Sequence, residues 1–298
     1  MIVQWQDKVA ACGRLTDNEP MARHTTLGVG GMARWYFSPS DSESLVRAMA
    51  MIPEDIPILP MGRGSNLLIA DEGFGGIVLD LGRLNRLDGQ GLKLCAEAGV
   101  RMSKAASYCA SKGLSGVEFM ATVPGDVGGG VAMNAGAFGQ QLSDTLRRVE
   151  VLGRSGKLQS LGASELDLGY RRCYLPHGSL VVTAHFELKQ DEIAAVRRRT
   201  RDIRKRRSAS QPLAQANCGS VFKNPPGHHA AALIEQAGLK GLRHGGARIS
   251  DVHANFIVNE GNACAGDVLA LIRRSQDEVA MRFSIHLEPE VRIVGGEA

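Results

Sequence analysis

The sequence predicts an α+β protein made of two units, the first ending near residue 190 and the second beginning near residue 208. Short strand-like and helix-like runs alternate over the first unit. A basic stretch at 197–207 interrupts this pattern, and a second pattern with two helix-like segments follows it. A length of 298 residues is also long for a single hydrophobic core, so a division of the chain is expected.

The first unit is expected to contain short strands and two helices, with a further division near residue 80. Apolar residues three and four positions apart predict helices at 42–51 and 102–112. Brief apolar runs bounded by turn residues predict the strands, which lie at 33–37, 56–61, 77–81, 148–152 and 180–188.

The second unit is expected to begin after the basic stretch and to contain two helices and a last strand. Helical spacing predicts one helix near 230–237 and a longer one at 265–283, where Val268 and Ile272 repeat on one face. The apolar residues at 291–294 predict a strand. Both units therefore mix helices and strands, which defines the α+β class.

The composition is that of a soluble globular protein, with 44% hydrophobic and 22% charged residues. No run approaches the ~18 uncharged apolar residues of a membrane span, so no membrane insertion is expected. Asp7 and Lys8 lie where a signal peptide needs an apolar core, which favours a cytoplasmic protein. The six cysteines form no CxxC pair and the eight histidines have no ligand spacing, so no metal is expected.

The net charge of +4 is concentrated in the basic stretch at 197–207, which has Asp202 as its single acidic residue. Outside this stretch acidic residues outnumber basic ones. The stretch is explained either as a solvated helix and linker, or as a patch for the phosphates of a small ligand or of nucleic acid. Because no aromatic stacking partners accompany the arginines, nucleic-acid binding would be non-specific at best.

Glycine is abundant, with 36 residues, and it is concentrated in clusters at 28–31, 62–65 and 124–139. Bare backbone N–H groups in such turns suit close approach to a pyrophosphate. Tight turns and close chain packing explain a single cluster equally well. No P-loop and no complete GxGxxG fingerprint are present, which disfavours P-loop NTPase and Rossmann folds. Three clusters together favour a large phosphate-bearing cofactor.

Six segments, read in order, resemble the UDP-N-acetylenolpyruvoylglucosamine reductase family of flavoproteins, in its shorter type. They are HTTLGVGGMA at 24–33, GRGSNLLIADEGFGGIVLDL at 62–81, GVEFMATVPGDVGGGVAMNAGAFG at 116–139, GYRRCYLP at 169–176, CGSVFKNPPG at 218–227 and LEPEVRIVG at 287–295. The order and spacing also agree with the family, and the match covers nearly the whole chain.

The resemblance implies an FAD-binding region of the vanillyl-alcohol-oxidase (PCMH) type at 20–190, in subdomains at about 20–80 and 81–190. A basic helix or linker at 191–207 and a C-terminal substrate-binding domain at 208–298 would follow. It also implies non-covalent FAD, NADPH as hydride donor, and UDP-N-acetylglucosamine enolpyruvate as substrate in peptidoglycan precursor synthesis. We expect small-molecule partners only, no nucleic acid, and a monomer.

Three catalytic residues follow from the family's pattern. Arg171 would hold the substrate carboxylate and stabilise the enolate that forms when hydride reaches the methylene carbon. Ser220 would donate a proton to the α-carbon, and Glu290 would help to stabilise the intermediate. Without the family match, a surface ion pair, a turn cap and a solvent-facing glutamate would be the ordinary explanations of these residues. Cys218, close to Ser220, is interpreted as a packing residue.

The resemblance also implies two sets of binding residues. The predicted substrate contacts are Tyr170, Lys223, Asn224 and Arg292. The predicted cofactor contacts are Gly62, Arg63, Gly64, Ser65, Asn66, Leu67, Pro124, Gly125, Val127, Gly128, Gly129, Asn134, Gly136 and Arg207.

The chain departs from the family's pattern at two positions. Asp126 stands where Thr, Ser or Cys is more usual, and a carboxylate beside a pyrophosphate is repulsive unless it points away or meets a cation. Ser210 stands where several relatives have lysine, which puts one diphosphate contact in doubt.

Two other functions compete with this interpretation of the sequence. Another flavin oxidoreductase would usually lack the segments CGSVFKNP at 218–225 and EPEV at 288–291. A nucleic-acid-binding protein would use 197–207.

Overall fold

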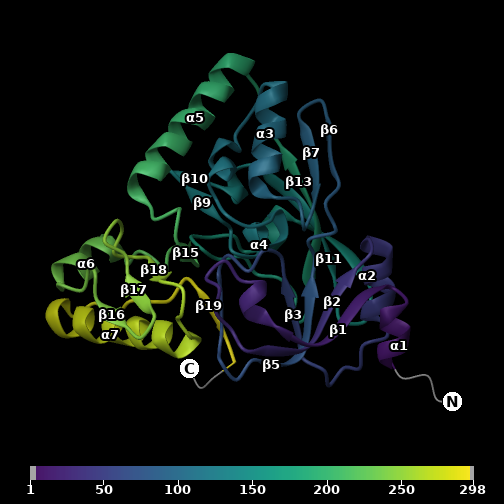
Figure 1. The fold of residues 1–298 in the computed structure, drawn as a ribbon. Coiled ribbons are helices and arrows are strands. Elements are labelled where there is room, and N and C mark those ends of the chain that lie inside the picture. The colour runs from purple at the N-terminus through teal and green to yellow at the C-terminus, as the bar shows by residue number, and fades with distance from the viewer. Residues whose placement is uncertain (1–4, 296–298) are drawn as a thin grey trace. The chain divides into compact units, whose positions relative to one another are not determined.

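A computed structural model describes residues 5–295 (Figure 1). The chain forms two units, each made of several chain segments. Within that range the first unit comprises 5–17, 35–62 and 76–206, and the second comprises 18–34, 63–75 and 207–295. The start of the segment considered as a signal peptide (1–4) and the end of the predicted C-terminal domain (296–298) lie outside the described residues.

The N-terminal sheet has the strand order β1-β2-β5-β3, in which β3 and β5 pair in parallel. Trp35, Phe37 and Leu45 belong to the core packed beside it. The Asp41 side chain caps α2 by accepting a 2.7 Å hydrogen bond from the Ser44 N–H. The elements are α1 (Trp5–Ala10), β1 (Gly13–Pro20), β2 (Met32–Pro39), α2 (Ser42–Met49), β3 (Ile58–Met61) and β5 (Phe74–Asp80).

The first unit also contains an antiparallel five-stranded sheet of order β12-β11-β13-β7-β6. Its core includes the fully buried Phe119 and Phe186. The helix α3 ends at Gly113, whose φ of 68° lies in the left-handed region that glycine adopts without strain. The elements are β6 (Leu87–Gln90), β7 (Lys93–Glu97), α3 (Met102–Lys112), α4 (Val127–Ala132), β11 (Leu146–Leu152), β12 (Leu158–Gly162) and β13 (Leu180–Glu187).

The basic stretch lies in α5 (Ile193–Ser210), which runs beside α3 (Figure 1). Val196 and Thr200 form its buried side, and the Arg204 guanidinium donates a 3.3 Å hydrogen bond to the Ser107 hydroxyl on α3. Most other cations of the helix are exposed. The predicted basic helix is therefore present, and only one side of it packs on the protein.

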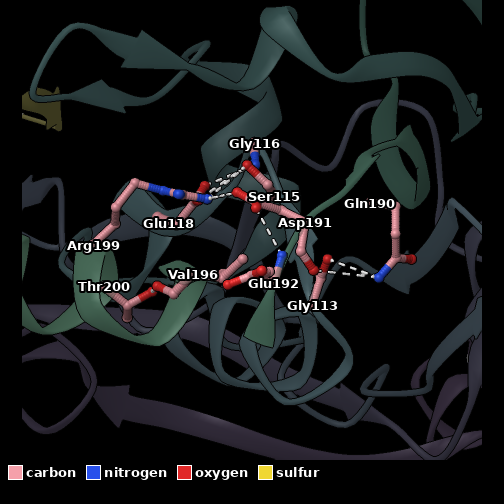
Figure 2. A network of polar contacts seen from close by, with 10 residues as sticks. All are labelled: Gly113, Ser115, Gly116, Glu118, Gln190, Asp191, Glu192, Val196, Arg199 and Thr200. Atoms are coloured by element: carbon pink, nitrogen blue, oxygen red, sulfur yellow. Dashed lines mark hydrogen bonds and ion pairs between the residues drawn. The ribbon is translucent and has the colours of Figure 1, made fainter. Parts of the chain in front are cut away.

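Arg199 attaches α5 to the buried Glu118, as Figure 2 shows. The Arg199 guanidinium donates hydrogen bonds of 2.9 and 2.8 Å to Glu118 Oε1 and one of 2.6 Å to Asp191. Glu118 also accepts from the Gly116 N–H at 2.7 Å and the Ser115 hydroxyl at 3.1 Å. Burial opposes the charge of Glu118, but these hydrogen bonds and Arg199 outweigh it and lower the pKa of its carboxyl group.

The second unit joins its three segments in one core that contains Leu27, Leu68, Phe222 and Leu271. Its four-stranded antiparallel sheet has the order β15-β18-β17-β16, and β19 pairs in parallel with β4. The elements are β4 (Leu67–Ile69), β15 (Ala216–Asn217), α6 (Ala230–Gln236), β16 (Arg243–His244), β17 (Ala247–Ile249), β18 (Ile257–Asn259), α7 (Ala265–Phe283) and β19 (Arg292–Val294).

The helices and strands expected from the sequence are all present, and most differ from their predicted bounds by one to three residues. Several elements were not expected, including α1, β1 and the hairpin of β6 and β7. The remaining short elements are the strands at 114–115, 136–137, 140–141 and 189–190 and the 3-10 helices at 21–23, 118–121, 142–144 and 163–165.

Residues 18–34 and 63–75 lie early in the sequence, and they belong to the same unit as the C-terminal residues.

Candidate functional site

The glycine cluster at 124–139 combines close packing with an open backbone face. A methyl group on Gly128 would lie 2.7 Å from the Ala98 methyl carbon, and one on Gly130 would lie 2.9 Å from the Met102 sulfur. Nothing lies within 4 Å of the same position on Gly129, which is exposed. Packing therefore explains two of these glycines, and the third leaves bare backbone that a ligand can approach.

Gly62 and Asp126 fit together in the first unit. The Asp126 side chain is buried and turned toward Gly62, so that a methyl group at position 62 would overlap its carboxylate. Asp126 precedes α4 but its side chain does not cap that helix. Glycine at 62 therefore leaves room for the carboxylate at 126, which would have to shift if position 62 carried a side chain.

Arg171 lies at the tip of a tight turn in the first unit. Gly169 and Arg172 exchange backbone hydrogen bonds of 3.0 and 3.1 Å, and Arg171 has a φ of 53°. Its guanidinium donates a 2.8 Å hydrogen bond to the Gly136 carbonyl and lies 5.1 Å from the centre of the exposed Tyr170 ring. The structure thus brings Arg171, Tyr170 and Gly136 together.

Gly136 begins a hairpin in which β9 (Gly136–Ala137) pairs with β10 (Gln140–Gln141). The turn residues Phe138 and Gly139 both have positive φ, 54° and 79°. The Arg206 guanidinium lies 4.9 Å from the centre of the Phe138 ring, a cation–π contact between α5 and the tip of the hairpin.

Arg207 carries a charge that the described protein neutralises poorly. It is half-buried, and its Nε atom has no hydrogen-bond partner among the described residues. Burial lowers the pKa of its guanidinium to about 10, so the group stays protonated near pH 7. A buried charge without a counter-ion is unfavourable, so this site favours an anionic ligand.

In the second unit the segments of Ser220 and Glu290 are hydrogen-bonded neighbours. The Glu290 N–H donates a 2.7 Å bond to the carbonyl of Val221, the residue after Ser220. The Asn66 amide donates to the Glu290 carbonyl at 2.9 Å, and the Arg292 N–H donates to the Asn66 carbonyl at 3.0 Å. Three predicted segments, at 63–67, 218–224 and 287–292, therefore meet in this unit.

The segment at 24–33 joins the same cluster. The Thr26 N–H donates to the Gly64 carbonyl at 3.3 Å, and the Thr26 hydroxyl donates to the Asn217 carbonyl at 2.7 Å. Asn259 donates a further 3.0 Å bond to the Leu27 carbonyl. Thr26 thus links the glycine turn to the chain that leads into Ser220.

Asn255 holds the backbone beyond Ser220 and was not anticipated from the sequence. Its buried side chain accepts from the Phe222 N–H at 2.9 Å and donates to the Phe222 carbonyl at 2.8 Å. The only available signal was a polar residue within an otherwise apolar run. Cys218 is buried, which raises the pKa of its thiol to about 12, and its interpretation as a packing residue is confirmed.

Two predicted substrate residues have protein partners. Lys223 forms an ion pair with Glu288, and Asn224 accepts a 3.0 Å hydrogen bond from the Ala230 N–H at the start of α6. Arg292 is exposed on β19. Ligand contacts of these residues stay predictions.

Within residues 5–295 no group of three or more His, Cys, Asp and Glu side chains could hold a metal ion. The same part of the chain contains no helix long and apolar enough to cross a membrane.

Comparison with known proteins assigns the family. A model for an FAD binding domain matches residues 33–162, and one for the C-terminal domain of UDP-N-acetylenolpyruvoylglucosamine reductase matches 211–294. A UDP-N-acetylenolpyruvoylglucosamine reductase from Alkalilimnicola ehrlichii is 44% identical over 284 residues, which cover 95% of each chain. The chain belongs to the UDP-N-acetylenolpyruvoylglucosamine reductase family.

Other members of this reductase family agree. A reductase from Methylococcus capsulatus is 42% identical over 95% of this chain and 94% of its own. The crystal structure of the Thermus caldophilus reductase superposes with a TM-score of 0.84 and 36% identity, over 95% of this chain and all of that one. The predicted fold class, an FAD-binding region followed by a C-terminal α+β domain, is confirmed, as are FAD as cofactor and an oxidoreductase class.

Proposed function

We propose that this protein reduces the enolpyruvyl ether of UDP-N-acetylglucosamine enolpyruvate to give UDP-N-acetylmuramate, with NADPH as electron source. The product serves peptidoglycan precursor synthesis. The observation that carries the proposal is the backbone hydrogen bond from the Glu290 N–H to the Val221 carbonyl, because it joins the two segments that contain the proton donor and the acid implied by the family's pattern. Family membership along 95% of the chain supports the same reaction.

The residues present fit FAD. Gly129 offers bare backbone on an open face, and the guanidinium of Arg207 calls for an anion such as a pyrophosphate. The chemistry that bound FAD would supply is the transfer of a hydride from NADPH to the methylene carbon of the enolpyruvyl group. The remaining predicted cofactor residues apart from Asn134 lie in the glycine-rich segments at 62–67 and 124–136. We propose that they bind FAD non-covalently.

Arg171 serves the substrate carboxylate in this proposal. Hydride addition to the methylene carbon moves negative charge into the carboxylate as an enolate, and a fixed cation there lowers the barrier. A guanidinium presents several N–H donors in a planar fork that matches a carboxylate. The hydrogen bond to the Gly136 carbonyl fixes one side of that fork, so its direction is set before substrate binds.

Ser220 then gives its proton to the α-carbon, and Glu290 assists in stabilising the intermediate. Serine is a weak acid, but an enolate is basic enough to remove its proton. The Ser220 loop begins at Gly219, with a φ of 79°, and its far side is held by Asn255. Such backbone support keeps a donor at a constant distance from the carbon that it protonates.

We further propose that Tyr170, Lys223, Asn224 and Arg292 bind the UDP-sugar. Cationic and amide groups of this kind suit phosphate and sugar oxygens. The protein would act in the cytoplasm as a monomer, on small molecules and not on nucleic acid.

A visible spectrum followed by two additions tests this function. We expect a yellow protein whose flavin is released into the supernatant by acid precipitation. NADPH should bleach the flavin absorbance, and the enolpyruvyl substrate should restore it in the absence of oxygen. Flavin that stays in the pellet would contradict non-covalent binding, and reduced flavin that the substrate leaves unchanged would contradict the reaction.

A further inference from the structure

Asn134 is a completely buried polar residue at the base of the exposed hairpin 136–141. Its φ of 43° lies in the left-handed region, which asparagine, aspartate and glycine tolerate best. A residue held in this conformation with a buried amide needs specific partners.

The Asn134 amide is hydrogen-bonded on both sides. Its Nδ2 atom donates to the Gly169 carbonyl at 2.8 Å and to Gln141 Oε1 at 3.2 Å. Its Oδ1 atom accepts from the Ser143 N–H at 3.0 Å. Both amide hydrogens are therefore used inside the protein, so the side chain has no donor left for the cofactor contact predicted from the family's pattern.

Gly169 is the first residue of the turn that presents Arg171. The turn and the hairpin are linked twice, once from Asn134 to the Gly169 carbonyl and once from Arg171 to the Gly136 carbonyl. The two hydrogen bonds run in opposite directions between the same two segments. Two such bonds constrain the orientation of the turn more tightly than either bond alone.

We infer that Asn134 is a positioning residue, which orients the turn so that the Arg171 guanidinium meets the substrate carboxylate. This inference rests on the proposed function. Asn134 would then affect the half-reaction in which the substrate reoxidises the flavin, and it would do so through Arg171. The reason is that its shorter hydrogen bond, to the Gly169 carbonyl, ends on the turn that contains Arg171.

Asn134→Asp isolates the donor bonds. Aspartate tolerates the same φ and still accepts from the Ser143 N–H, but it has no hydrogen for the Gly169 carbonyl. Reoxidation of the reduced flavin by the enolpyruvyl substrate should slow by about 10- to 100-fold, the cost of a displaced catalytic group. The substrate concentration for half-maximal reoxidation should rise, while flavin reduction by NADPH should change by less than ~2-fold.

Two further variants provide the controls. Asn134→Gly keeps the backbone conformation but has no amide, so it should also slow reoxidation and leave flavin reduction nearly unchanged. The inference can therefore be tested even if the aspartate variant folds poorly. Gln141→Ala removes the longer donor contact and leaves the bond to Gly169, so reoxidation should slow by less than ~3-fold.

A double-mutant cycle with Arg171→Ala closes the test. If Asn134 acts through Arg171, Asn134→Asp should slow reoxidation by less than ~2-fold more when Arg171 is already absent. The inference would be overturned if Asn134→Asp slowed reoxidation by its full 10- to 100-fold in the Arg171→Ala protein. It would also be overturned if the Asn134 variants slowed reoxidation by no more than Gln141→Ala does. Wild-type reduced flavin that the substrate does not reoxidise would instead contradict the proposed function, as would an Arg171→Ala variant with normal reoxidation.

Discussion

Ser220 offers the most direct test at the scale of single residues. Ser220→Ala should leave flavin reduction by NADPH unchanged, because that half-reaction takes no proton from the serine. Reoxidation by the enolpyruvyl substrate should slow by about 10²–10⁴-fold, the contribution of a positioned general acid. Stopped-flow absorbance of the flavin separates the two halves. Ser220→Cys should keep part of the rate, and slowed NADPH oxidation would refute the assigned role.

Arg207 is expected to bind the cofactor through its charge. Arg207→Met removes a half-buried guanidinium whose Nε has no acceptor among residues 5–295, so the FAD-free protein should lose little stability. FAD should bind about 10- to 100-fold more weakly, as for the loss of a charged hydrogen bond. Fluorescence titration of the apoprotein with FAD measures this. The exposed Arg201→Met is the matched control on the same helix, and equal affinities in both variants would refute the role.

The fit between Gly62 and Asp126 predicts a rescue. Gly62→Ala should destabilise the FAD-free protein by about 1–3 kcal/mol, because the new methyl group overlaps the buried carboxylate. Adding Asp126→Ser, the smaller residue type usual in the family, should recover most of this loss. Urea unfolding of the two variants and of Asp126→Ser alone checks the prediction. Additive losses would show that the carboxylate is not the obstacle.

At the scale of elements, the attachment of α5 by Arg199 and Glu118 should depend on pH. The folded pKa of Glu118 is lowered, so its stabilisation is present above its unfolded pKa of about 4.3 and disappears as the pH falls through the lower folded value. Glu118→Gln should therefore cost about 1.5–3 kcal/mol at pH 6 and much less at pH 3. Chemical unfolding at both values measures the difference.

Arg199→Lys is the matched change on the helix side, and it should cost less because it keeps the charge. If Glu118→Gln lowered the free energy of unfolding equally at the two pH values, the loss would be due to packing and not to the charge of Glu118.

Periodicity predicted the long elements well and the glycine-rich ones poorly. Apolar spacing predicted α3 and α7 with the same bounds that the structure has. It could not give α4, whose sequence VGGGVA is unfavourable for a helix and which owes its formation to contacts such as that of Gly128 with Ala98. The helix α4 forms because of tertiary packing, which a local sequence pattern does not predict.

At the scale of the whole molecule, the sequence could identify the site segments but not their supports. Resemblance to the family named Arg171, Ser220 and Glu290. It gave no reason to single out Asn255, or to expect that the Asn134 side chain binds protein. Both are buried amides that hold backbone from distant parts of the chain, and such partners depend on the completed fold.

The division of each unit into separate chain segments also depends on contacts that form only in the completed fold. Leu27 and Leu68 lie in one core with residues after 207, and nothing local in the segments 18–34 and 63–75 predicts this. Hydrophobic patterns indicate which residues are buried. They do not indicate against which part of the chain these residues pack, which the long-range pairing of β4 with β19 shows.

The pairing of β4 with β19 has a consequence for how the chain folds during its synthesis on the ribosome. The strand β4 emerges early in translation, and its backbone partner at 292–294 is made only after some two hundred further residues. During this interval β4 is an unpaired apolar edge of the kind that invites association with other chains. Premature termination before residue 292 would leave it so permanently. Shortened products of this gene should therefore be insoluble or degraded, even when the FAD-binding region has been translated in full.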